Sequence, residues 1–286
     1  MKALIPSVKS TVTSPDCREW LPTGFDNALR ELDHLSESCG GQDEIPLYRG
    51  HANTDWLLDS TFVRKELDMK YGYKAPYPRP LGFHTEVSDA LLAKFTRRWR
   101  PSDEALAKEL SDGIDPDYEM MKHIQQYVKN DIEPRGTFLI DWTVERDIAL
   151  FFSTYEGNGA ARRLRGSAGA LWVFYPMATG KILMTMKMRD ILVMMSDASF
   201  RLNAERTLPL IFHPSKQTAM LRAMAQKPVY VAQMDYRYDL ADAWIGTENE
   251  RGCSVFKKII LSEDVLSDVV RHLDRVGIDE SRVYPD

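Results

Sequence analysis

Three short polar segments of the chain hold residue types that could bind an anion. The first contains Tyr48, Arg49, Gly50 and His51, the second contains Asp141, Trp142 and Thr143, and the third lies around Arg222 and Gln226. The planar guanidinium of Arg49 matches two oxygens of a phosphate or carboxylate, and Gly50 lets a ligand approach the backbone closely. Because each segment adjoins an apolar run typical of a strand, we expect the three to line one pocket.

Each of these segments also has an ordinary structural interpretation. Arg49 could form an ion pair, since arginines at strand ends are common in any domain. Thr143 could cap a helix whose first turn carries Glu145 and Asp147, with Asp141 satisfying loop amides and Trp142 in the core. A carboxylate near a helix N-terminus tends to stay ionised, so Asp141 suits electrostatic stabilisation better than acid catalysis. The residues alone leave both interpretations open.

Other clusters of reactive or charged side chains are less specific. Basic runs occur at 97–100, where Trp99 is interleaved, and at 162–165. The first has the composition of a single-stranded nucleic-acid surface, but the overall acidic balance favours solvated surface segments. The histidines show no metal-ligand spacing and no H-E-x-x-H, and the three cysteines lack C-x-x-C spacing. We therefore expect neither a metal site nor a disulfide framework.

Composition limits the class of protein. The 286 residues are 44% hydrophobic, enough to bury a full core, and the formal net charge is −5. That charge argues against a chain whose main task is to coat phosphate backbones. No apolar run approaches the length of a membrane span, and the segment 1–8, broken by Pro6, is too short for a secretory signal. We expect a cytoplasmic protein without membrane association.

The patterning of apolar residues predicts alternating strands and helices. Phe25, Leu29 and Leu32 indicate an amphipathic helix before the first strand. The expected strands are 45–49, 139–143, 169–175 (central in the sheet), 208–212, 229–233 and 254–261, and the expected helices are 24–37, 84–98, 102–110, 117–128, 145–155 and one from Ser262 to Gly277.

This order predicts an α+β fold with a mixed, mostly antiparallel sheet. We expect an N-terminal helical segment over 1–43 and one compact domain over 44–286, with a helical insertion at about 83–128 and an exposed loop over 68–82. No repeat or low-complexity tract interrupts the chain. A separate N-terminal subdomain is the alternative.

The segments together resemble the FRG domain, a bacterial family named for an aromatic-Arg-Gly motif, present here as Tyr48-Arg49-Gly50. The run 139–143 resembles the family's L-L-D-W-T signature, 222–231 its R-x-x-x-Q segment, and 273–286 its closing helix and tail. His51 stands where the family usually has glutamine, and Phe138 where it has arginine.

A more distant likeness is to ADP-ribosyltransferases, which use NAD. The resemblance implies an ADP-ribosyltransferase-like sheet core, with Arg49 binding the phosphate or ribose of NAD beside Tyr48, Gly50, His51, Trp142 and Arg222. It implies that Asp141 and Thr143 line the nicotinamide pocket and that Gln226 lies near the catalytic glutamate position. Since Gln226 carries no charge, Asp141, Glu145 or Glu205 must supply the carboxylate.

The resemblance implies two functions from different classes. One is an NAD-dependent ADP-ribosyltransferase-like effector of the toxin or phage-defence type, which modifies nucleic acid or protein and has an antitoxin as a candidate partner. The other is a non-catalytic module that binds a nucleotide or a nucleic-acid end. A nuclease would need clustered metal ligands, which the sequence lacks.

Overall fold

A computed structural model describes most of the chain. The described residues are 19–35, 45–72, 75–96, 108, 111, 115–127, 136–154, 168–176, 187–197, 211–212, 221–244 and 255–285. The three cysteines, the two basic runs and Glu205 lie outside them, as do most of the expected helix over 102–110 and most of the strand over 208–212.

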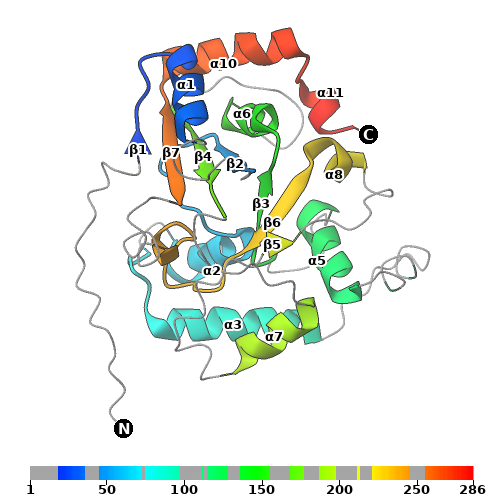
Figure 1. Ribbon diagram of the computed structural model, residues 1–286. Coiled ribbons are helices and arrows are strands. Elements are labelled where there is room, and N and C mark those ends of the chain that lie inside the picture. Colours follow the sequence, from blue (N-terminus) through cyan, green and yellow to red (C-terminus); the bar gives the residue numbers. More distant parts are fainter. Residues whose placement is uncertain are drawn as a thin grey trace.

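A seven-stranded sheet lies at the centre of the described residues, in the order β1-β7-β4-β2-β3-β6-β5 (Figure 1). Strand β1 runs parallel to β7, and the other neighbouring pairs are antiparallel. The strands are Glu19–Trp20 (β1), Leu47–His51 (β2), Leu139–Thr143 (β3), Gly169–Phe174 (β4), Ile211–Phe212 (β5), Pro228–Ala232 (β6) and Phe256–Leu261 (β7). The mixed, mostly antiparallel sheet is confirmed, whereas its ADP-ribosyltransferase type stays a prediction.

Strands β2 and β3 are joined at one point. Their register pairs Tyr48 with Thr143, while β2 pairs with β4, and β3 with β6, over five residue pairs each. The sheet therefore consists of a half around β4 and a half around β6. Tyr48 and Thr143 belong to the first two polar segments, so these segments meet where the two strands pair.

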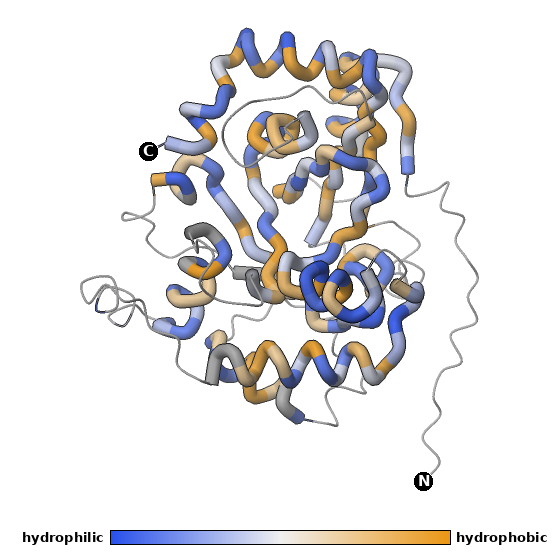
Figure 2. The backbone as a smooth tube through the Cα atoms, turned by 180° about the vertical axis from the view of Figure 1, so that it is seen from behind, coloured by the Kyte–Doolittle hydropathy of each residue, from blue (hydrophilic) through white to orange (hydrophobic). Residues whose placement is uncertain are grey.

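Helices cover the sheet on both sides, and each side has its own apolar core. One core joins α1 (Phe25–Leu35), α6 (Arg146–Thr154) and α10 (Glu263–Val276) to the sheet. The second joins α2 (Thr61–Tyr71), α3 (Leu81–Thr96), α5 (Pro116–Tyr127) and α7 (Met188–Ser196) to β3 and β6. Figure 1 places the two groups at opposite ends of the view. In Figure 2 the turns of α10 alternate between hydrophobic and hydrophilic, as expected of a helix that covers a core.

Helices α2, α3 and α5 lie between β2 and β3, and the first of them begins earlier than the expected helical insertion at about 83–128. Helix α2 includes residues 68–71, which were predicted to be loop. Its N-terminus is capped by Ser60, whose side chain accepts a hydrogen bond from the Val63 amide at 3.4 Å, and Phe62, Val63 and Leu67 are buried. The prediction was wrong there because the Tyr, Lys and Gly residues after Asp68 hid the end of an amphipathic helix.

The chain's ends pack on the same sheet. Strand β1 pairs with β7, and α1 contacts α10, so the described part of the predicted N-terminal segment belongs to this sheet. Two short helices, α8 (Leu221–Gln226) and α11 (Glu280–Val283), contact each other near the C-terminus. Helix α10 ends at Gly277, which adopts the left-handed conformation, as predicted. None of the helices in the described ranges is long and apolar enough to cross a membrane.

Candidate anion-binding site

The Arg49 guanidinium bridges strands β2 and β3. Its Nη1 donates a short hydrogen bond to the backbone carbonyl of Asp141, and its Nε donates to Nε2 of His51 at 3.0 Å. Burial lowers the pKa of Arg49 to about 10, opposed by the charge of Asp141, so the group remains a cation at neutral pH. The two bonds fix the guanidinium plane and leave Nη2 without a partner in the described part of the chain.

The carboxylate of Asp141 lies on the same side of the sheet as helix α5. Its Oδ2 accepts a hydrogen bond from the Gln125 amide at 2.9 Å, and the Gln125 Oε1 accepts one from Thr137 at 2.9 Å. The buried Oδ1 has no hydrogen-bond partner among the described atoms. Burial raises the pKa of Asp141, and the nearby charge of Arg49 and the bond from Gln125 oppose that shift. One carboxylate oxygen is thus held and the other is available.

Two further arginines face Asp141 from other elements. Arg64, on α2, and Arg222, on α8, both act to lower the pKa of the Asp141 carboxyl, as Arg49 does. The guanidinium carbon of Arg222 lies 4.1 Å from the ring centre of Tyr284, and its buried Nε has no hydrogen-bond partner in the part of the chain that the structure describes. Arg64 donates to the Thr61 hydroxyl at 3.2 Å. We name Arg49, Arg64 and Arg222, whose charges all act on Asp141, the arginine cluster.

None of the three arginines forms an ion pair within the described residues. Each is partly buried. Arg79 provides the contrast, because both its terminal nitrogens bind the Asp59 carboxylate and the pair is almost fully buried. The electrostatic neighbours of Arg64 also include Asp59 and Asp68. A partly buried guanidinium without a carboxylate partner is poorly solvated, so the arginine cluster can accommodate an added anion.

His51 lies next to the Arg49 side chain on β2, and it is 2% exposed. Burial first, and then the charges of Arg49, Arg64 and Lys258, hold its pKa well below the ordinary histidine range. The ring is therefore neutral, and its Nε2 can accept the Arg49 hydrogen bond. In this position the histidine orients the guanidinium. Its predicted role in binding a ligand stays a prediction.

Tyr48 and Gly50 face the other side of β2, since successive side chains of a strand point to opposite faces. A Cβ atom at Gly50 would lie 1.9 Å from the Ala149 carbonyl oxygen of α6, so only glycine permits this packing. Tyr48 packs in the core beneath α6, where burial raises the pKa of its phenol. The structure therefore separates these two predicted binding residues from the side chain of Arg49.

Trp142 and Thr143 also have structural environments. Trp142 is 2% exposed and packs against Phe174 and Phe256, with ring centres 5.6 and 6.0 Å away. Thr143 accepts a hydrogen bond from the Glu145 amide at 3.0 Å and so stabilises the turn between β3 and α6. It was predicted to be the helix cap, but α6 begins at Arg146, three residues later. The two side chains thus shape the strand end that presents Asp141.

Gln226 is turned toward the C-terminus. Its amide donates to the Val283 carbonyl at 3.1 Å and thereby joins α8 to α11. The same junction brings Arg222 onto the ring of Tyr284. Of the predicted residues in this segment, Arg222 therefore lies in the arginine cluster, while the Gln226 amide is occupied by a backbone contact.

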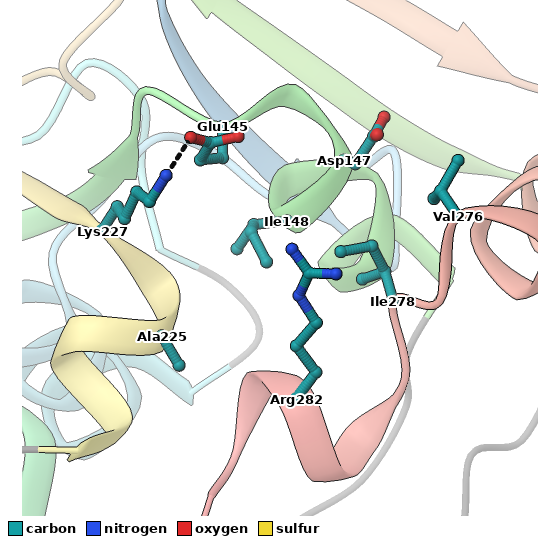
Figure 3. Close-up of a pocket in the computed structure, with 8 residues that line it drawn as sticks. All are labelled: Glu145, Asp147, Ile148, Ala225, Lys227, Val276, Ile278 and Arg282. Carbon is teal, nitrogen blue, oxygen red and sulfur yellow. Dashed lines mark hydrogen bonds and ion pairs between the residues drawn. The ribbon is translucent and has the colours of Figure 1, made fainter.

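A small pocket of about 160 Å³ lies at the start of α6, between α8 and α11 (Figure 3). Glu145, which was one of three candidate carboxylates, forms an ion pair with Lys227 on its rim. Arg282 points into the pocket toward Ile148, and Asp147 lies 3.1 Å from the His272 ring. The residues that line this pocket include none of the arginine cluster and not Asp141, so the pocket is separate from that cluster.

No group of three or more potential metal ligands occurs within the described ranges. Sequence reasoning missed Gln125 and Arg64, which lie on helices of the insertion. Neither belongs to a motif, because an arginine on the polar face of α2 and a glutamine near the end of α5 are ordinary helix residues. Only the pairing of strands and helices in space brings them to Asp141.

A family model described as the FRG domain matches residues 45–161. The matched span begins before β2 and ends after α6, so it contains Arg49, Arg64, Gln125 and Asp141. The segments 222–231 and 273–286, in which the same resemblance was expected, lie beyond the match. No curated protein and no solved structure matches the chain.

Proposed function

Since residues 45–161 form an FRG domain, we propose that this domain and the C-terminal segment bind a nucleotide of the NAD class and transfer its ADP-ribosyl group. The observation that carries the proposal is the arginine cluster. Three guanidiniums that form no ion pair within the described residues act electrostatically on one carboxylate, whose Oδ1 has no hydrogen-bond partner among the described atoms. A pyrophosphate supplies the complementary negative charge and several acceptor oxygens.

Asp141 is the carboxylate that best suits the chemistry. Cleavage of the ribose–nicotinamide bond gives an oxocarbenium-like transition state, and its electron pair leaves with nicotinamide. A lone pair on the acceptor then forms the new bond to the ribose carbon, and the acceptor loses a proton. The unpartnered Oδ1 of Asp141 can stabilise the positive sugar, while Gln125 holds the other oxygen in place. Glu145 is less suitable because Lys227 pairs with it.

The position of Gln226 favours a second candidate function. In the resemblance to ADP-ribosyltransferases this residue falls near the catalytic glutamate, yet here it is an uncharged amide bonded to the Val283 carbonyl. A domain with this arrangement could bind the nucleotide, or a nucleic-acid end, without cleaving it. The arginine cluster would then serve recognition alone.

Nicotinamide release from NAD by the purified protein tests the proposal. The expected result is release that Arg49→Ala and Asp141→Ala abolish and that Arg271→Ala leaves unchanged. Arg271 is a matched control because it is an exposed arginine on α10 that pairs with Asp268 along its own helix. Binding of NAD without release would favour the second candidate. A wild-type protein that neither binds nor cleaves NAD would contradict both.

We further propose that the protein acts as a toxin or phage-defence effector on a nucleic-acid or protein acceptor. Expression in a bacterial host, compared between the wild type and Asp141→Ala, tests this role. Growth arrest by the wild type alone would support it, and normal growth with both would contradict it. Transfer of labelled ADP-ribose from NAD to added RNA or protein would identify the class of acceptor.

A further inference from the structure

A second cavity, of about 590 Å³, is lined in part by Arg64 of the arginine cluster. It is bounded by α2, by residues 55–59 and by residues 75–79. Its volume is in the range of small-molecule sites. Arg64 lines the cavity and also faces Asp141, so the cavity and the arginine cluster share one side chain.

Two aromatic rings line the cavity. Trp56 is 43% exposed and Tyr77 is 44% exposed, although large aromatic side chains are usually more buried than this. The Tyr77 hydroxyl is hydrogen-bonded to Asp242, and its ring packs edge-on against Tyr238 at 6.4 Å. Trp56 packs edge-on against His51, with ring centres 5.9 Å apart. Both rings are thus held in place while part of their surface remains open to a ligand.

The charges around the cavity are balanced. Three carboxylates (Asp55, Asp59 and Asp68) and three cationic side chains (Arg64, Lys65 and Arg79) line it. Asp59 and Arg79 neutralise each other in a buried, two-bonded pair. A balanced lining with open aromatic surface suits an uncharged aromatic group better than a phosphate.

We infer that this cavity binds the nucleoside part of the nucleotide whose phosphates occupy the arginine cluster, with the base stacked on Trp56. The inference rests on the proposed function. It assigns a binding site to the nucleoside, which is the part of the ligand that the arginine cluster does not bind. Arg64 lies where the two parts of such a ligand join. His51 contacts both Arg49 and Trp56, and it therefore connects the arginine cluster with the cavity.

Binding measured by calorimetry with two ligands tests the inference. ADP-ribose carries a base and a pyrophosphate, whereas inorganic pyrophosphate carries no base. Trp56→Ala should weaken ADP-ribose binding about tenfold, as expected for loss of one stacked base, and leave pyrophosphate binding unchanged. Trp56→Phe, which keeps a ring, should recover most of the affinity. Thermal unfolding checks that the variants are folded, which the exposure of Trp56 favours.

The outcomes separate this inference from the proposed function. If Trp56→Ala binds ADP-ribose as tightly as the wild type, the nucleoside lies elsewhere and the inference is wrong, while the arginine cluster can still bind phosphate. If Trp56→Ala weakens both ligands equally, Trp56 supports the arginine cluster only, and the inference is again overturned. If the wild type binds neither ligand, the proposed function fails and the inference fails with it.

Discussion

The Nη1 atom of Arg49 donates a hydrogen bond to the backbone carbonyl of Asp141, ninety-two residues further along the chain. The bond joins β2 and β3 near their single registered pair. It gives Arg49 a structural task, to join the two halves of the sheet, and it presents the rest of the guanidinium beside the Asp141 carboxylate. The first two polar segments of the sequence therefore meet, as the sequence predicted.

Replacing Arg49 with lysine should weaken nucleotide binding although the charge is kept. An ammonium cannot reach His51 and the Asp141 carbonyl with a fixed fork and still present a further N–H to a ligand. Loss of one charge-assisted hydrogen bond corresponds to about 1.5–3 kcal/mol, or roughly ten- to hundredfold in affinity. Titration with ADP-ribose measures this loss of affinity, with Arg271→Lys as the control. Wild-type affinity in Arg49→Lys would contradict the geometry.

Gly50 is predicted to tolerate no side chain, for a reason that concerns packing rather than ligand binding. Gly50→Ala would place a Cβ atom 1.9 Å from the Ala149 carbonyl oxygen, so α6 must move away from the sheet. We expect a loss of about 3 kcal/mol or more in the free energy of unfolding. Gly24→Ala is the control, because nothing lies within 4 Å of its added Cβ. Equal denaturant midpoints for the two variants would refute the prediction.

The neutral state of His51 predicts a pH dependence of stability. The unfolded histidine takes up a proton near its ordinary pKa of 6.5, whereas burial and the charges of Arg49, Arg64 and Lys258 keep the folded ring unprotonated. Because the unfolded state then binds more protons, the free energy of unfolding falls as pH drops below about 6.5. Glutamine accepts the same hydrogen bond but does not titrate.

His51→Gln should therefore lose less stability than the wild type between pH 7.5 and pH 5.5, as measured by denaturant unfolding at both values. Asp239, whose pKa burial raises to about 6, acts in the opposite direction in this range. Its contribution is common to both proteins and cancels in the comparison. If both proteins lost the same stability on acidification, His51 would be protonated in the folded state.

The buried pair of Arg79 and Asp59 should stabilise the wall of the larger cavity. Arg79→Ala leaves the Asp59 carboxylate buried with only the Gln233 amide as a side-chain partner, at 2.7 Å. Breaking such a pair costs about 3–5 kcal/mol. The midpoint of thermal unfolding should decrease strongly for Arg79→Ala. It should hardly change for Arg271→Ala, because the Asp268 partner of Arg271 is exposed to solvent. A small decrease of the midpoint in both variants would mean that water solvates the Asp59 carboxylate.

The strands that carry the site could be predicted from the sequence because their signals are local. Alternating or continuous apolar residues identified β2, β3, β4, β6 and β7 to within two residues, and Ser262 and Gly277 marked the ends of α10. Helix α2 was not predicted, since its polar last turn resembles a loop. With α2 missing, Arg64 could not be assigned to any site.

The orientation of side chains was harder to predict than the position of the strands. Arg49 and Gly50 are neighbours in one motif, yet the strand turns them to opposite faces, so a motif mixes residues that bind with residues that pack. Gln226 shows the same limit, because its partner is the Val283 carbonyl, which a sequence pattern does not reveal. The contact of Arg222 with Tyr284 likewise depends on the packing of α8 against α11.

The most direct test of the account is the affinity for ADP-ribose of Arg64→Ala and Arg222→Ala, measured by calorimetry beside the wild type and Arg271→Ala. These two residues come from separate helices and share only their position around Asp141. If the arginine cluster is one anion site, each variant should lose about tenfold or more in affinity, and the control should lose none. Unchanged affinity in either variant would contradict a single site formed by the three arginines.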